Sequence, residues 1–115
     1  MEKNIEISIL CQIYGKLLTQ KQLSILEDYY NMDLSLSEIA ENNKITRQAV
    51  RDIIKKGEKK LFEFEEKLQI MKKMQKQEKQ ISIILSELLQ IETRYSDEQI
   101  AKILTHIKSE LNCLV

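Results

Sequence analysis

Apolar residues recur at every third or fourth position through most of the chain, which is the spacing of helices with one buried face. The first such run extends from Ile5 to Leu18, although the alternation in "IEISI" would also fit a strand. The 115 residues include no Pro and two Gly, and the tight turns between strands depend on those residue types. We therefore predict an all-helical protein.

Residues that cap helices stand directly before several apolar runs. Thr19 with Gln22, and Ser35 with Glu38, have the spacing of a capping box, in which two side chains bond free backbone N–H groups at the helix start. Thr46 has the position of a further N-cap. The stretch "SLSEIAENNKITRQAVRDII", residues 35–54, thus predicts a short helix, a tight turn and a longer helix.

This stretch is typical of a helix-turn-helix. Such a motif requires a small residue where the helices cross, an apolar residue in the turn, an N-cap and apolar anchors on the second helix. The stretch supplies them in order: Ala40, Ile45, Thr46, Val50 and Ile53. Lys44 stands where Gly often provides a left-handed backbone, and we expect Asn42 and Asn43 beside it to take over that conformation.

Beyond Arg47 no strong helix stop appears until well past residue 60, and an apolar stripe continues along the chain. Its members are Leu61, Phe64, Leu68, Met71, Ile81, Ile84, Leu85, Leu88 and Ile91. The stripe can pack on a second copy, fold back on the head or pair with the last helix. We divide the chain into a helix-turn-helix domain, 1–61, and a C-terminal helical extension, 62–115, continuous with the domain's last helix, and we expect a homodimer.

The last helix is predicted at about residues 96–112. It begins at a capping box of Ser96 to Gln99. We expect it to bury the apolar residues Ile100, Ile103, Leu104, Ile107 and Leu111.

Charge is unevenly distributed although the formal net charge is zero. Residues 1–43 carry three basic and seven acidic residues, whereas residues 44–60 carry seven basic and two acidic residues. With Val50 and Ile53 facing inward, the first turns of the second helix present Arg47, Gln48 and Arg51 outward. Arg can form two hydrogen bonds to guanine and Gln two to adenine, so we predict base contacts there. The predicted phosphate contacts are Ser35, Lys44, Thr46, Lys55 and Lys56.

Other chemistry has little support in the sequence. Cys11 and Cys113 lie near opposite ends without metal-ligand spacing, and we expect both to be inert, part-buried thiols. His106 lacks a nearby nucleophile, so we expect no enzyme activity, no metal and no cofactor. Tyr29, Tyr30, Phe62 and Phe64 are interpreted as core residues rather than as a base-stacking platform. No apolar stretch approaches the roughly 20 residues that span a bilayer, and we expect a cytoplasmic protein.

The stretch "SLSEIAENNKITRQAV" resembles the helix-turn-helix of region 4 of bacterial sigma factors. The longer segment 17–68, "LLTQKQLSILEDYYNMDLSLSEIAENNKITRQAVRDIIKKGEKKLFEFEEKL", resembles the YlxM-like family of small bacterial proteins. The likeness covers about residues 1–85, and the final helix has no place in it. The resemblance implies an all-α, sigma-70 region 4-like and winged-helix-like head with long C-terminal helices, DNA binding without enzyme activity, and a link to the signal recognition particle.

Two functions follow as expectations. The first is a cytoplasmic bacterial regulator that binds nucleic acid, DNA more than RNA, through residues 46–56. The second is an adaptor that docks on the particle's GTPase or RNA, with the basic helix as a solvated or partner-facing surface. Salt distinguishes them, because displacing counterions from phosphates makes affinity fall steeply with ionic strength.

Overall fold

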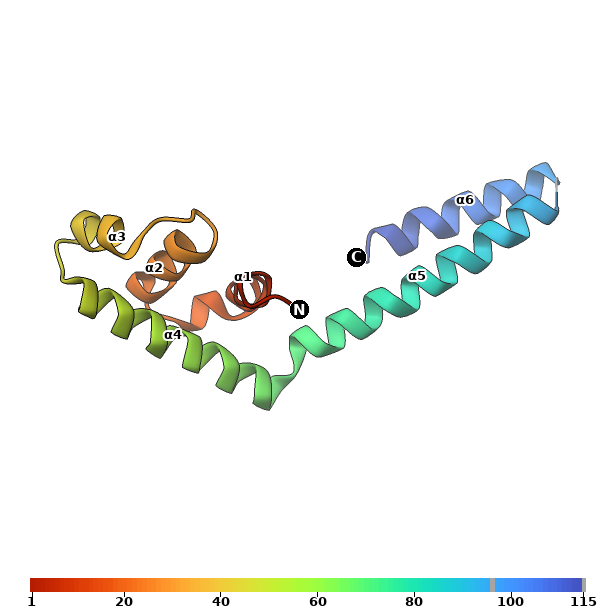
Figure 1. Cartoon of the computed structure of the whole chain (residues 1–115). Helices are drawn as coiled ribbons and strands as arrows, with labels where there is room; N and C mark the ends of the chain where they lie inside the picture. Colours follow the sequence, from red (N-terminus) through yellow and green to blue (C-terminus); the bar gives the residue numbers. More distant parts are fainter. Residues whose placement is uncertain (96, 115) are drawn as a thin grey trace. The chain divides into compact units, whose positions relative to one another are not determined.

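The computed structural model describes residues 1–95 and 97–114, and most of them lie in α-helices (Figure 1). The elements are α1 (Lys3–Tyr14), the 3₁₀ turn η1 (Gly15–Leu17), α2 (Gln20–Tyr30), α3 (Leu36–Asn43), α4 (Arg47–Leu68), α5 (Ile70–Arg94) and α6 (Glu98–Asn112). None of the described residues is in a strand, and "IEISI" lies within α1. The all-helical prediction is confirmed. None of these helices is both long and apolar enough to cross a membrane.

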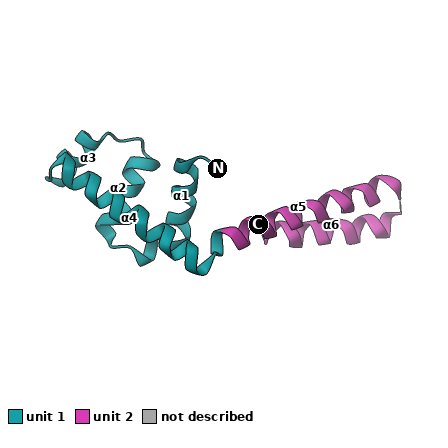
Figure 2. Ribbon diagram, turned by 60° about the horizontal axis from the view of Figure 1, so that its bottom comes forward, with its two compact units in different colours: residues 1–71 teal, residues 72–115 magenta. Residues whose placement is uncertain are grey.

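The described chain forms two units, residues 1–71 and residues 72–115 (Figure 2). We call the first unit the head and the second the hairpin. Helix α4 runs unbroken across residues 61 and 62 and ends at Leu68. Gln69 then takes a left-handed conformation, with φ 55° and ψ 31°, and α5 begins at Ile70.

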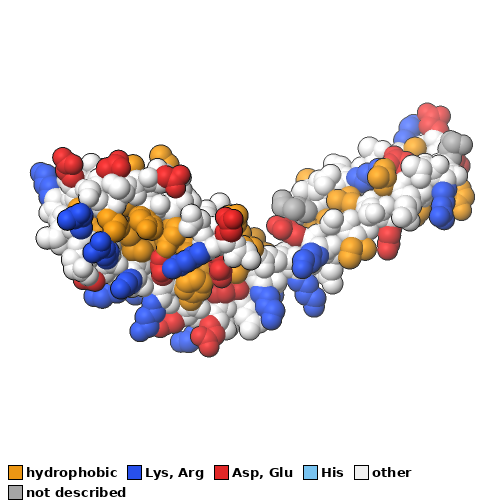
Figure 3. Space-filling model, viewed as in Figure 1, with side chains coloured by type: hydrophobic (Ala, Val, Ile, Leu, Met, Phe, Trp, Pro, Cys, Tyr) orange, Lys and Arg blue, Asp and Glu red, His pale blue; other side chains and the backbone are white. Residues whose placement is uncertain are grey.

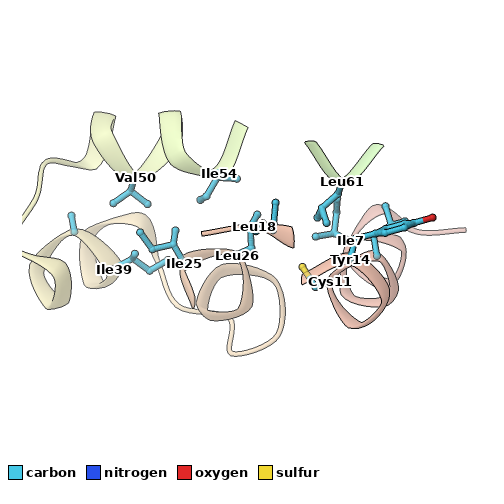
Figure 4. Packing of buried hydrophobic residues seen from close by; sticks show 12 residues of the cluster. Ile7, Cys11, Tyr14, Leu18, Ile25, Leu26, Ile39, Val50, Ile54 and Leu61 are labelled. Carbon is cyan, nitrogen blue, oxygen red and sulfur yellow. The ribbon is translucent and has the colours of Figure 1, made fainter. Parts of the chain in front are cut away.

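Four helices of the head share one apolar core (Figure 4). Val50 of α4 points toward Ile39 of α3 and Ile25 of α2, while Leu61 at the other end of α4 points toward α1. The fully buried side chains are Ile7, Leu10, Tyr14, Ile25, Leu26, Ile39, Val50 and Leu61. Because each helix supplies part of this core, the backbone positions of α3 and α4 are fixed by packing rather than by helix propensity.

Gly57 lets α2 and α4 approach closely. A Cβ atom at this position would lie 2.7 Å from Cδ1 of Leu26, which is fully buried. Glycine costs about 1 kcal/mol relative to Ala in a helix interior. Here the missing side chain makes room for the core, so the cost has a structural reason.

The predicted caps are present in the head. Thr19 and Gln22 form a capping box, as do Ser35 and Glu38. The Thr46 hydroxyl accepts a hydrogen bond from the backbone N–H of Ala49 at 3.0 Å. Each cap satisfies N–H groups that have no partner within the helix, which fixes where α2, α3 and α4 begin.

The turn between α3 and α4 differs from the expectation. Lys44 itself is left-handed, with φ 56° and ψ 43°, whereas Asn42 and Asn43 remain helical. The position just past the last helical residue takes this conformation, so that the next N–H groups can reach back to free carbonyls. The N–H of Ile45 accordingly donates to the carbonyl of Ala40 at 3.1 Å. The expectation that the two Asn residues take over was therefore wrong.

Lys44→Gly is expected to raise stability and weaken nucleic-acid binding together. A left-handed non-Gly residue costs about 1–2 kcal/mol, so Gly should stabilise the head by roughly that amount and raise Tm by several degrees. The same change removes a predicted phosphate contact. Calorimetry and salt titrations of duplex binding measure the two effects, and Lys44→Arg is the control that keeps both charge and strain. A lower Tm for Lys44→Gly would contradict this account.

The start of α5 is held by side chains of the head. The Tyr14 hydroxyl donates to Oε1 of Glu65 at 2.7 Å and accepts from the N–H of Ile70 at 3.2 Å. The same Glu65 oxygen accepts from the N–H of Met71 at 3.0 Å. Burial and the bond to Glu65 raise the pKa of Tyr14, so the phenol remains a donor. These contacts cap α5 with residues that lie far apart in the sequence.

The hairpin consists of α5 from residue 72 onward and of α6, which lie side by side and antiparallel (Figures 1 and 2). Ile81 and Leu104 are buried between them, and Lys108 pairs with Glu92. Ile103 is 60% exposed and Ile107 is 37% exposed, so the expected burial of these two is wrong within this chain. The predicted capping box at residues 96–99 involves Ser96, which lies outside the described residues.

Candidate nucleic-acid interface

The side of α4 that faces away from the core carries most of the predicted contacts. Val50 and Ile54 are buried, while Arg47, Arg51 and Lys55 are exposed. These three lie four residues apart in turn, so they form one row along the helix. Lys44, Lys56 and Gln48 are also exposed beside the row. Figure 3 shows Lys and Arg side chains gathered along this part of the head.

The cations of this row are available for a ligand. Among the described residues, the side chains of Arg47, Arg51 and Lys55 have no hydrogen-bond or ion-pair partner, and neither do those of Lys44 and Lys56. Unpaired cations in water can neutralise phosphates and release the counterions that surround them.

Gln48 is already engaged. Its Nε2 donates to Oδ1 of Asp52 at 3.1 Å, one helical turn further on. Reading adenine needs an amide donor and the amide oxygen, and Asp52 already engages one of the two N–H donors of Gln48, so this bond restricts how the amide can turn toward a base. Sequence reasoning overlooked this role of Asp52, although the four-residue spacing of an amide and a carboxylate indicates such a pair.

Asp52→Asn is expected to strengthen duplex binding. The change removes a negative charge beside the phosphates, and at about 7 Å in water one charge pair is worth about 0.6 kcal/mol, or roughly threefold in affinity. The gain should shrink as salt is added. Fluorescence anisotropy with a labelled duplex measures it, and Glu63→Gln, on the same helix outside the row, is the control. An unchanged or weaker affinity for Asp52→Asn would count against α4 as the interface.

The two helix starts differ as phosphate sites. At α3 the Ser35 hydroxyl accepts from the N–H of Glu38 at 3.1 Å, and Oε1 of Glu38 accepts from the N–H of Ser35 at 3.3 Å. A carboxylate thus already occupies that helix start. The first turn of α4, behind Thr46, contains no acidic residue. The positive end of the α4 dipole is therefore the better of the two positions for a phosphate.

The cysteines lie apart from this interface. Burial, with a smaller contribution from Glu27, raises the pKa of the Cys11 thiol to about 11, which keeps it protonated and unreactive. Cys113 is exposed, so its expected partial burial is wrong. In the part of the chain that the structure describes, no group of three His, Cys, Asp or Glu residues could hold a metal ion.

Comparison with known families agrees with this geometry. The model of the UPF0122 family, described as "Putative helix-turn-helix protein, YlxM / p13 like", matches residues 1–106. The chain belongs to this family. The resemblance found in the sequence is confirmed, and it extends further than expected: the limit near residue 85 is wrong, because the match continues into α6.

Several UPF0122 proteins of bacteria are similar to this chain. A protein of Clostridium botulinum is 49% identical over 88 residues, which cover 76% of this chain and 81% of the relative. One of Clostridium kluyveri is 45% identical over 109 residues, 95% of each chain. One of Fusobacterium nucleatum is 38% identical over 107 residues, 93% of this chain and 97% of the relative. The family likeness therefore includes both the head and the hairpin.

Proposed function

We propose that the protein is a non-enzymatic regulator that binds a DNA duplex by inserting α4 into the major groove. The observation that carries the proposal is the row of unpaired cations, Arg47, Arg51 and Lys55, on the exposed side of a helix whose other side is buried. In a helix-turn-helix the start of the second helix reaches the base edges. The row begins at that start.

The side chains divide into two roles under this proposal. Arg47 and Arg51 read guanine and Gln48 reads adenine once its amide turns toward the base. Phosphates are held by Ser35, Lys44, Thr46, Lys55 and Lys56, with the α4 start as the stronger of the two helix-end sites. Phosphate contacts fix the register of the protein on the duplex, and base contacts supply the preference for sequence.

A comparison of Arg47→Ala with Lys56→Ala tests these roles. Arg47→Ala should lose about 1–3 kcal/mol of discrimination at one base position, so that preferred and unrelated duplexes bind more equally. Lys56→Ala should weaken all duplexes alike and reduce the salt slope by about one. A selected duplex and a scrambled duplex, titrated at several salt concentrations, give both quantities. Equal effects of the two variants on every duplex would refute the assignment.

We also propose that the protein is a homodimer that pairs through the hairpin. Apolar side chains remain exposed on both of its helices, including Ile83, Ile84, Ile91 and Ile103. A second copy would cover them and set the distance between two heads, as in dimeric helix-turn-helix proteins.

The link to the signal recognition particle is a further part of the proposal, as is a cytoplasmic location. The link to the particle is supported by the sequence resemblance to YlxM-like proteins. The alternative function is an adaptor for the particle's RNA or GTPase. Binding of the purified protein to a random DNA duplex, to the particle's RNA and to its GTPase distinguishes these functions. Salt-sensitive duplex binding that Arg47→Ala reduces supports the regulator, whereas binding to the GTPase alone supports the adaptor.

A further inference from the structure

A surface hollow lies beside α4 in the head, on the flank next to α2. Its volume is about 260 Å³. Leu36 and Ile54 give it apolar surface, Tyr29 and Tyr30 give it aromatic surface, and Arg51 and Lys55 line it with positive charge. Figure 3 shows apolar side chains exposed on the head close to Lys and Arg side chains. The hollow therefore combines an apolar surface with two cations of the proposed interface.

Two tyrosine rings pack edge to face in this hollow. The ring centroids of Tyr29 and Tyr30 lie 5.0 Å apart, and the ring planes are 89° to each other. The Tyr30 hydroxyl donates to Oε1 of Glu58, which fixes that ring. Tyr29 is 36% exposed, so its ring is open to a ligand. The interpretation of Tyr29 as a core residue is wrong, because the helix that carries it leaves it at the edge of the core.

The charges of the hollow favour an anion. Its acidic side chain, Glu58, is already paired: Oε2 lies 3.2 Å from Nζ of Lys3, and Oε1 accepts a hydrogen bond from the Tyr30 hydroxyl. Burial and the bond to Glu58 raise the pKa of Tyr30, so this phenol stays neutral. Arg51 and Lys55 have no partner within the described chain. An adjoining hollow of about 250 Å³ is lined by Asp33 and by neither of these two cations.

We propose that this hollow binds one unstacked nucleotide of a single-stranded segment, with the base against Tyr29 and a phosphate on Arg51 and Lys55. The proposal rests on nucleic-acid binding by the head and adds a second mode to it. The volume lies just below the roughly 300–1,000 Å³ of pockets for drug-sized ligands, which suits a single flat group. Aromatic rings beside cations are the usual surface for single strands, since every base has a face that stacks.

This site would give the head a preference for RNA loops and bulges. Bases splayed out of a helix are common in RNA, where they stack on aromatic side chains. Arg51 belongs both to the row on α4 and to the hollow, so an unstacked nucleotide here lies next to whatever α4 contacts. A duplex with an adjacent unpaired base would use both surfaces at once.

The probe is a single-stranded hexamer of adenylate, compared with an abasic hexamer that has the same phosphates and no bases. Tyr29→Ala should weaken the adenylate hexamer about five- to 150-fold, the effect of about 1–3 kcal/mol of base stacking. It should change the affinity for the abasic hexamer and for an intact duplex by less than about twofold. Tyr29→Phe keeps the aromatic face and should bind as the unchanged protein does.

Tyr29→Leu separates base stacking from docking of an apolar peptide. Leu keeps the apolar bulk and loses the flat ring, so it should behave like Tyr29→Ala toward the adenylate hexamer. The Tm of each variant shows whether it folds, and Phe and Leu replace Ala as the decisive pair if Ala unfolds the head. Equal binding of the two hexamers, or full binding by Tyr29→Leu, overturns the proposal.

The same titrations distinguish failure of this site from failure of the proposed duplex function. If Arg47→Ala loses duplex binding and the Tyr29 variants bind the adenylate hexamer as the unchanged protein does, the major-groove role of α4 stands and the nucleotide site is refuted. Hexamer binding that depends on Tyr29, without any duplex binding, would support the nucleotide site and remove the major-groove role.

Discussion

Leu61→Ala is expected to lower the free energy of unfolding of the head by about 2–5 kcal/mol, the range for removing a buried Leu side chain and leaving a cavity. Leu61 is fully buried, and it points toward Ile7 and Tyr14 of α1 (Figure 4). These residues hold the C-terminal half of α4 against α1, so the truncated side chain leaves a void that the rigid helices cannot fill. Urea denaturation followed by circular dichroism measures the loss.

Leu68→Ala is the matched control for this prediction. It makes the same chemical change on the same helix, but Leu68 is 47% exposed. Because about half of this side chain is already exposed, its removal should lower the free energy of unfolding by only about half of the burial energy of a Leu side chain, roughly 1 kcal/mol. Equal losses in the two variants would mean that α1 and α4 do not share the core described here.

Ile103→Glu is expected to convert the proposed dimer into a monomer. Ile103 is 60% exposed on α6, so a Glu there is tolerated by the single chain but places a charge in the proposed pairing surface. Analytical ultracentrifugation measures the change in mass. On a duplex with two half-sites, losing the linked second head should weaken binding by at least about a hundredfold.

Charges along the hairpin fit a second copy as the partner. Residues 72–79 hold four basic residues and one acidic residue, whereas residues 87–98 hold four acidic residues and one basic residue. Two hairpins that pair in antiparallel fashion would place each basic half beside the partner's acidic half. Ser109→Glu, an exposed polar position on the same helix, is the control that should remain dimeric. A monomeric unchanged protein at high concentration would contradict the proposal.

The parts of the fold that depend on neighbouring residues could be predicted from the sequence. Thr19, Ser35 and Thr46 cap helices through bonds to residues three positions away, and such bonds leave a clear pattern. The short helix, turn and longer helix followed from those caps together with buried Ile39 and Val50. The same logic placed Arg47 and Arg51 on the exposed side of α4.

Features that depend on distant residues could not be predicted in this way. The end of α4 at Leu68 depends on a left-handed Gln69 and on bonds from Tyr14, more than fifty residues away. The periodicity of apolar residues continues across this break and gives no sign of it. The candidate site shows the same limit, because spacing alone cannot reveal that Tyr29 of α2 lines a hollow with Arg51 of α4.

The contacts at the end of α4 have a mechanical consequence. Helix α4 has 22 residues and is therefore about 33 Å long, with Arg47 at one end and the bonds of Tyr14 and Glu65 at the other. A tilt of about 6° about the bonded end would move Arg47 by about 3.4 Å, the rise of one nucleotide along a DNA strand. Tyr14 and Glu65 thus lie at the end about which such a tilt would occur, and Arg47 lies at the opposite end. Under the proposed insertion of α4 into a major groove, a small tilt about this end would change which base step Arg47 reaches.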